Sequence, residues 1–63
     1  MFKMEFETNN AAFDDRDGPH EVARILRQIA QRIERGAVEA DIFDANGNRI
    51  GRWLLELDGE DDQ

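Results

Sequence analysis

The chain has 63 residues, and at this length folding buries only about 60% of the surface that the unfolded chain exposes, which leaves room for one small core and no second domain. It contains no cysteine, so disulfide bonds and thiolate-based zinc or iron–sulfur sites are excluded, and it has neither a run of roughly 18 apolar residues nor a secretory signal pattern. From these absences we expect a cytoplasmic protein that does not bind membranes. The formal net charge of −7 repels nucleic-acid phosphates, so we also expect no direct binding of nucleic acids.

The first predicted element is a strand at residues 2–8. Phe2, Met4 and Phe6 alternate with charged residues, which is the pattern of a strand with one face in the core and the other in water. A polar connection follows this strand. We expect the aromatic ring of Phe13, within that connection, to contact the core.

The second predicted element is an amphipathic helix at residues 19–36. Asp17 or Gly18 is the expected N-cap, and Pro19 follows at the first helical position, where its missing N–H costs nothing. Gly36 is expected to take the left-handed conformation that ends a helix. The apolar residues at helical spacing are Val22, Ile25, Leu26, Ile29 and Ile33.

Polar residues of this helix lie off its apolar stripe. Glu21 is in the first turn, where a carboxylate suits the positive end of the helix dipole. We expect the arginines on the solvated face, opposite the stripe. Residues 20–35 carry a net charge of +2. The whole chain carries −7, so the charges of all other residues sum to −9. The four arginines are Arg24, Arg27, Arg32 and Arg35.

A second strand is expected at residues 38–43, because apolar residues again alternate with outward-facing ones. Asn46 and Gly47 follow it, and this pair is the strongest short-range signal of a hairpin. Both residues tolerate positive φ, so we expect a two-residue type I′ turn.

The third predicted strand covers residues 49–57. Ile50 is out of phase with Trp53, and a glycine lies between them, so we expect a bulge near residues 50–52 that returns Ile50 to the core. The residues expected on the inward face are Trp53, Leu55 and Leu57.

The order of elements is β-α-β-β, which predicts an α+β fold with one helix on a three-stranded sheet. We expect residues 1–57 to form a single domain and residues 58–63 to be an acidic flexible tail. The first strand can lie parallel beside the second, or the third can fill a gap between them in the order 1-3-2. We favour the order 1-3-2, which is antiparallel and places the strand of Trp53 in the centre.

In either arrangement one face of the sheet has no helix over it. Phe43 and Leu54 are expected to point toward this open face among charged side chains, which makes it a candidate surface for a protein partner or a second copy of the chain. Arg24 and Arg27, on the basic side of the helix, are the second candidate.

The side chains needed for catalysis are scarce. The chain has no Ser, Cys or Tyr and only one Lys, one Thr and one His, so we expect no enzyme, no catalytic residue, no cofactor and no small-molecule site. His20 is expected to be an exposed residue of the first helical turn. Two acidic segments near residues 14 and 44 resemble the start of a calcium loop, but Arg24 and Leu55 stand where its final glutamate belongs, so we assign no metal site.

Three segments resemble a family of small uncharacterised proteins encoded by bacteriophages and prophages. They are residues 7–13, 21–26 and 46–51, and the resemblance extends over most of residues 1–55. This chain departs from the family pattern at Asn9, where aspartate is more common, and in a third strand that alternates less regularly. The resemblance implies a phage or prophage accessory role and carries no active residues to transfer.

Together these observations favour a non-enzymatic interaction module that acts through a protein partner or as a homodimer. The alternative is an acidic inhibitor that imitates the charge of nucleic acid and blocks a host DNA-binding or defence protein, and its basis is the charge of −9 outside the helix. A solubilising role for that charge is the third interpretation.

Overall fold

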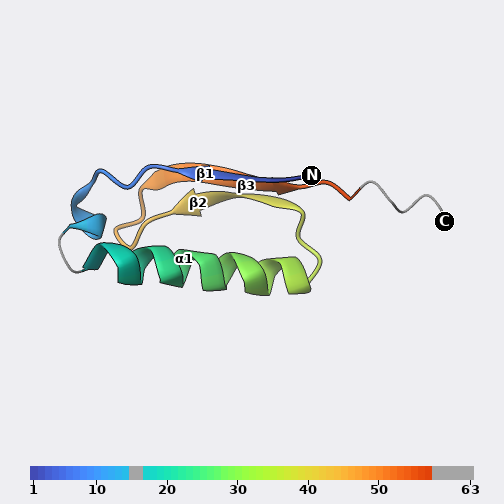
Figure 1. Ribbon diagram of the computed structural model, residues 1–63, viewed down its shortest axis with the longest axis horizontal. Helices are drawn as coiled ribbons and strands as arrows, with labels where there is room; N and C mark the ends of the chain where they lie inside the picture. Colours follow the sequence, from blue (N-terminus) through green and yellow to red (C-terminus); the bar gives the residue numbers. More distant parts are fainter. Residues whose placement is uncertain (15–16, 58–63) are drawn as a thin grey trace.

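The computed structural model describes residues 1–14 and 17–57, which form two layers, a helix and a sheet (Figure 1). Helix α1 (Asp17–Glu34) lies along one face of the sheet, and no described element covers the other face. The expected α+β fold is therefore confirmed, whereas the acidic tail predicted at residues 58–63 lies outside the described residues. In chain order the elements are β1 (Phe2–Phe6), the 3-10 turn η1 (Ala11–Phe13), α1 (Asp17–Glu34), β2 (Glu39–Phe43) and β3 (Arg49–Leu55).

The three strands lie in the order β1-β3-β2, and both pairings are antiparallel, as the sequence predicts. The central strand is β3, which carries Trp53 against Met4 on one side and Ala40 on the other. Trp53 is only 1% exposed. Strand β3, which contains the most apolar run of the three strands, thus has a neighbouring strand on both sides.

The predicted bulge forms in β3. Ile42 pairs with Gly51 but Phe43 pairs with Arg49, so Ile50 has no partner on β2 and its side chain turns into the core. Glycine is required at position 51, because an added Cβ would collide with the carbonyl oxygen of Glu5 in the neighbouring strand. The close approach of β1 to β3 depends on that missing side chain.

The helix is displaced from its predicted bounds by two residues at each end. Asp17 lies within the first turn instead of capping it, because its N–H donates to the carbonyl of Asp14 at 3.0 Å and extends the helix backwards. At the other end Gly36 has φ +105°, which confirms the left-handed termination. The N–H of Ala37 donates to the carbonyl of Arg32 at 3.0 Å, the Schellman arrangement that satisfies the last turn.

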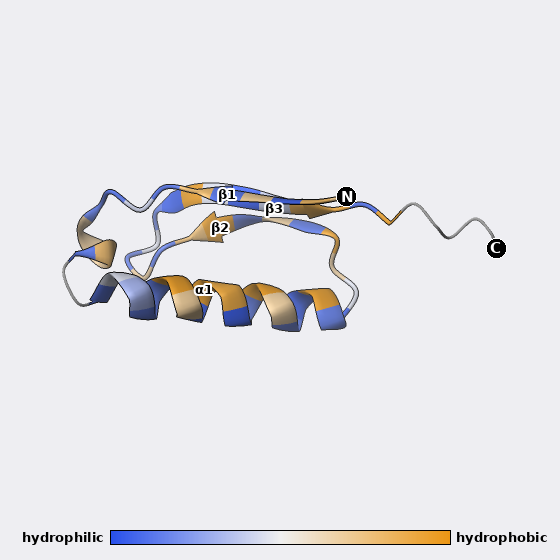
Figure 2. Ribbon diagram, viewed as in Figure 1, coloured by the Kyte–Doolittle hydropathy of each residue, from blue (hydrophilic) through white to orange (hydrophobic). Residues whose placement is uncertain are grey.

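The core lies between α1 and the sheet, and the apolar stripe of the helix faces the strands (Figure 2). Each fully buried large side chain contributes roughly 1.5–3 kcal/mol to folding. The ring of Phe13 packs on Phe6 with centroids 6.3 Å apart, which confirms that this residue holds the connection against the core. The buried core residues are Phe13, Ile25, Ile29, Ile42, Ile50 and Trp53.

The strands are shorter than predicted. Strand β1 ends at Phe6, although the N–H of Glu7 still donates to the carbonyl of Ile50 at 2.9 Å. Strand β3 ends at Leu55, and Leu57, which the sequence places on the inward face, is 73% exposed. The prediction for Leu57 was wrong because α1 ends at Glu34, and no other described element covers that end of the sheet.

Candidate functional site

The four residues predicted for a partner surface lie on different layers of the molecule. Phe43 is 48% exposed, and Leu54, which pairs with residues of both neighbouring strands, is partly buried on the open face. Arg24 and Arg27 are exposed residues of α1, on the other layer. The structure therefore does not bring all four residues into one surface.

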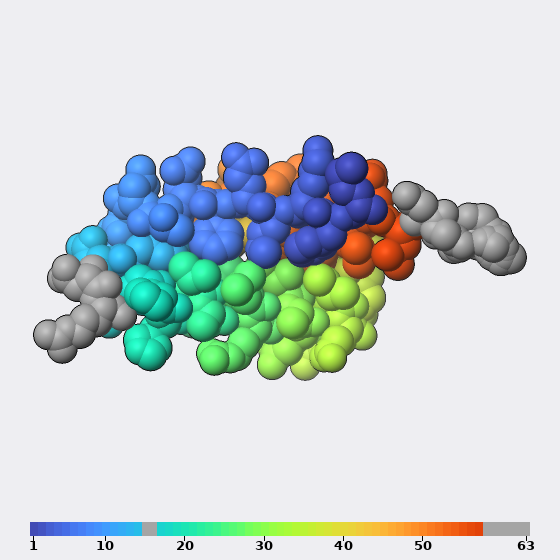
Figure 3. Space-filling model, viewed as in Figure 1, coloured from blue at the N-terminus to red at the C-terminus, as the bar shows by residue number. Residues whose placement is uncertain are grey.

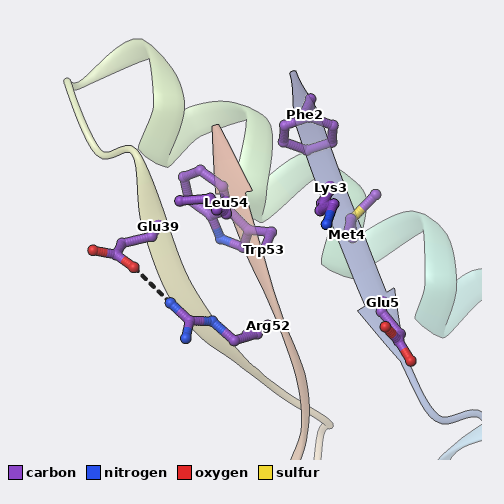
Figure 4. Close-up of a pocket in the computed structure, with 8 residues that line it drawn as sticks. All are labelled: Phe2, Lys3, Met4, Glu5, Glu39, Arg52, Trp53 and Leu54. Carbon is purple, nitrogen blue, oxygen red and sulfur yellow. Dashed lines mark hydrogen bonds and ion pairs between the residues drawn. The ribbon is translucent and has the colours of Figure 1, made fainter. Parts of the chain in front are cut away.

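The open face is crossed by ion pairs between β2 and β3. Arg52 contacts Glu39 at 2.5 Å and Arg49 contacts Asp41 at 3.0 Å, and all four side chains are about half exposed. Such exposed pairs contribute about 0–1 kcal/mol each. A shallow depression of ≈ 670 Å³ lies beside the first pair (Figure 4). Two ion pairs thus lie on the face where the sequence predicts Phe43 and Leu54 among charged side chains.

A buried carboxylate joins α1 to the hairpin. Glu21 accepts hydrogen bonds from Nε and Nη2 of Arg24, at 2.9 and 2.8 Å, and from the backbone N–H of Ala45 at 2.8 Å. The hydrogen bond from Arg24 is the main reason why the pKa of Glu21 is lowered, although burial acts in the opposite direction. Arg24 is accordingly held by its own helix, and part of the predicted solvated face is structural.

A second buried carboxylate, Asp44, fixes the hairpin connection. Its oxygens accept from the backbone N–H groups of Asn46 and Asn48, both at 2.9 Å, and from the amide of Asn10 at 2.8 Å. These bonds, the backbone N–H of Asn48 first, lower the pKa of Asp44. The loop before α1 and the hairpin are thereby tied to one side chain.

The connection includes Asn46 and Gly47 but is not the two-residue type I′ turn that the sequence predicts. The N–H of Gly47 donates to the carbonyl of Asp44, and the N–H of Asp44 donates to the carbonyl of Asn48, both at 3.0 Å. Gly47 has φ +85°. This is a three-residue loop with a left-handed glycine, selected because the carboxylate of Asp44 takes the N–H groups that follow it.

The edge of β2 is free of any described strand. The N–H of Leu55 donates to the carbonyl of Val38 at 2.7 Å, so every second residue from Val38 directs its backbone groups toward β3. The N–H and C=O groups of Glu39, Asp41 and Phe43 consequently point away from the sheet. They are available to hydrogen-bond an added strand.

A groove of ≈ 200 Å³ runs between this edge and α1. The helix contributes Arg24, Gln28 and Arg32 to it, and β2 with the residue after it contributes Asp41, Phe43 and Asp44. A second depression, of ≈ 370 Å³, continues along the helix. It is lined by Gln28, Gln31, Arg32, Arg35 and Ala37. The groove thus brings together Phe43 and Arg24 from the predicted set, without Leu54 or Arg27.

Arginines and carboxylates both line the groove, and they differ in whether they are paired. Arg24 is paired with Glu21, and Asp41 is paired with Arg49 across the sheet. Arg32 and Arg35, by contrast, form no ion pair with any carboxylate in residues 1–14 and 17–57. Arg32 lines the groove and Arg35 lines the depression that continues from it, so two arginines without an ion pair among the described residues lie on this side of α1.

Other functional features are few in the described part of the chain. Within it, no three acidic or histidine side chains are grouped as a metal site would require, and no helix is long and apolar enough to cross a membrane. His20 is exposed in the first turn of α1, as the sequence predicts. Comparison of the chain with protein-family models, with curated proteins and with solved structures found no match.

Proposed function

We propose that this protein is a non-enzymatic interaction module that binds an extended, acidic segment of a partner protein at the free edge of β2. The segment adds a fourth strand beside Glu39, Asp41 and Phe43, and its carboxylates lie opposite Arg32 and Arg35. The observation that carries the proposal is that the edge of β2, to which no described strand is hydrogen-bonded, borders a groove lined by Arg32, which forms no ion pair with a described carboxylate, and that Arg35 follows along the helix.

The physical basis is strand addition. Backbone hydrogen bonds to an exposed edge give affinity, and side chains flanking the edge select the sequence that is bound. The edge of β2 offers three residues with outward N–H and C=O groups. The arginines disfavour a basic segment and attract an acidic one, although the chain as a whole is acidic.

A fluorescent peptide of alternating glutamate and valine tests the proposal. Its binding is measured by anisotropy, beside a matched peptide of alternating lysine and valine, and the amide NMR shifts of β2 report the site. We expect the acidic peptide to bind and to shift the amides of Glu39, Asp41 and Phe43. The variant Arg32→Glu is expected to weaken this binding by about tenfold, since opposite charges become like charges.

Arg27→Glu is the matched control, because it makes the same change of charge on α1 at a residue that does not line the groove. It is expected to leave the affinity within about twofold of the unaltered protein. Equal weakening by both variants, or binding of the acidic peptide without amide shifts in β2, would show that the groove is not the site.

We also propose, from the resemblance of residues 7–13, 21–26 and 46–51, that the module is an accessory protein of a phage or prophage in the bacterial cytoplasm. The resemblance is the support for this setting. The neighbouring genes test it: recombination, lysis or anti-defence genes beside the coding sequence support a phage origin, whereas a neighbourhood of host metabolic genes argues against it.

The charge outside the helix favours a second candidate, an inhibitor that imitates nucleic acid. The geometry gives this candidate less support, because Glu39 and Asp41 are paired with arginines and do not form a free acidic row. Binding of a basic, DNA-binding protein that is lost at moderate salt would favour charge imitation over strand addition.

A further inference from the structure

We infer that β1 pairs with β1 of a second copy of this chain, antiparallel and in register about Met4, to form a six-stranded sheet. This inference is independent of the proposed function, because β1 is the opposite edge of the sheet from β2. The two copies are related by a twofold axis, so both helices cover the same face of the joined sheet.

The edge of β1 has the correct backbone groups for such pairing. The N–H of Glu7 donates to β3 at Ile50, and the carbonyl of Met1 accepts from Glu56 at 2.7 Å. Odd-numbered residues of β1 therefore bond to β3, and the even-numbered residues direct their N–H and C=O groups outward. The outward residues are Phe2, Met4 and Phe6.

Charge selects one register among those that the outward groups allow. With Met4 opposite Met4 of the second copy, Lys3 faces Glu5 of the second copy on the open side, and the symmetry makes this pair twice. A register centred on Lys3 places two lysines opposite each other, and a register centred on Glu5 places two glutamates together. The Met4 register is thus the one with opposite charges, and it also forms the most backbone hydrogen bonds.

Apolar residues on the helix side match the same register. Phe2, which is 45% exposed, falls opposite Phe6 of the second copy and gains an aromatic neighbour. Leu26 is 42% exposed on the flank of α1 away from the basic groove. Strand β1 lies directly against α1 along this side of the molecule (Figure 3). Dimerisation would cover the apolar surface that this side leaves exposed.

The other edge opposes self-pairing. Its outward residues are Glu39, Asp41 and Phe43, so the corresponding symmetric register places Asp41 opposite Asp41 of the second copy. Natural sheets protect free edges with charges of this kind. In β1 the charges are arranged to attract, and only there do both the charges and the apolar residues favour a second copy.

Charge reversal with the full chain tests the interface by sedimentation over a range of concentrations. We expect the unaltered protein to dimerise, and Lys3→Glu and Glu5→Lys each to raise the dimer dissociation constant at least about tenfold, since each makes both cross-strand pairs like-charged. An equimolar mixture of the two variants should restore the dimer, because every pair between them is again of opposite charge. Arg35→Glu, the same change of charge beside the β2 groove, should leave dimerisation unchanged.

A second measurement needs no variant. In the dimer the amide of Met4 is hydrogen-bonded, so its hydrogen exchange should slow as protein concentration rises, whereas the amide of Asp41 on the other edge should not respond. A chain that sediments as a monomer at millimolar concentration overturns the inference. So does a dimer that survives both reversals, or variants that fail to recover on mixing while circular dichroism shows them folded. Peptide binding at β2 is measured separately and is unaffected by these outcomes.

Discussion

The contact between Gly51 and β1 predicts a large effect from the smallest side-chain addition. In Gly51→Ala the new Cβ would overlap the carbonyl oxygen of Glu5 and lie 2.6 Å from the Cα of Phe6. Both are backbone atoms, which cannot rotate away as a flexible side chain does. Strand β1 must therefore move as a unit or separate from β3.

The cost follows from the distances. Carbon atoms pack best at roughly 3.5–4.0 Å, so β1 must move by about 1 Å, which stretches its hydrogen bonds to β3. Overpacking typically costs about 1–3 kcal/mol, and we expect about 3 kcal/mol or more here because backbone is displaced. At about 0.05–0.15 kcal/mol per residue, a chain of this length has a total stability of roughly 3–9 kcal/mol. The substitution thus removes a large part of the stability of the fold.

Urea unfolding measures this cost through the fluorescence of Trp53, the single tryptophan, which is buried in the core. Gly36→Ala is the matched control: Gly36 has φ +105° but no atom within 4 Å of the added Cβ. Its expected cost is about 1–2 kcal/mol, from the backbone conformation alone. Our reasoning about β1 would be refuted if Gly51→Ala were as stable as Gly36→Ala or more so.

Further predictions concern the two buried carboxylates, Glu21 and Asp44, and the core. Because the pKa values of Glu21 and Asp44 are lowered by folding, both carboxylates stabilise the fold above their ordinary values of 4.5 and 3.8, and this stability is lost as the pH falls through the lowered pKa values. The urea midpoint should therefore drop between pH 5 and pH 2, and less steeply in Glu21→Gln, although that variant is less stable at pH 7. Ile25→Ala should cost about 2–5 kcal/mol by leaving a cavity, whereas Leu26→Ala, at an exposed neighbour, should cost less than about 1 kcal/mol in thermal unfolding of the dilute protein.

The sequence predicts the architecture well because its apolar residues follow simple periods. The spacing of Val22, Ile25 and Ile29 specifies a helix, and the alternation before and after it specifies strands, so the elements and their order are correct. The break in alternation at Ile50 indicates the bulge. Element ends were predicted less accurately: Leu57 has the right phase for a strand, but no described element packs over it.

The candidate site was harder to predict, because it depends on which side chains meet. Glu21 suits the helix dipole in the sequence and lies three residues before Arg24 on the same helix, but its bond to the N–H of Ala45 arises only when the hairpin docks on α1. Asp44 precedes a turn, and this is the local signal for a carboxylate that caps the loop. That Arg32 forms no ion pair among the described residues can be seen only when the partners of all the neighbouring charged side chains are known.

The central strand is also the last of the three in the sequence. Strands β1 and β2 have no contact with each other in the sheet, since each is joined through β3. While the chain is being synthesised, neither has a hydrogen-bonding partner within the sheet until residues 49–55 have left the ribosome. The helix can form on the nascent chain, but its isoleucines have no sheet to cover before that moment. Folding should therefore be completed late and in one step, when β3 pairs with both β1 and β2.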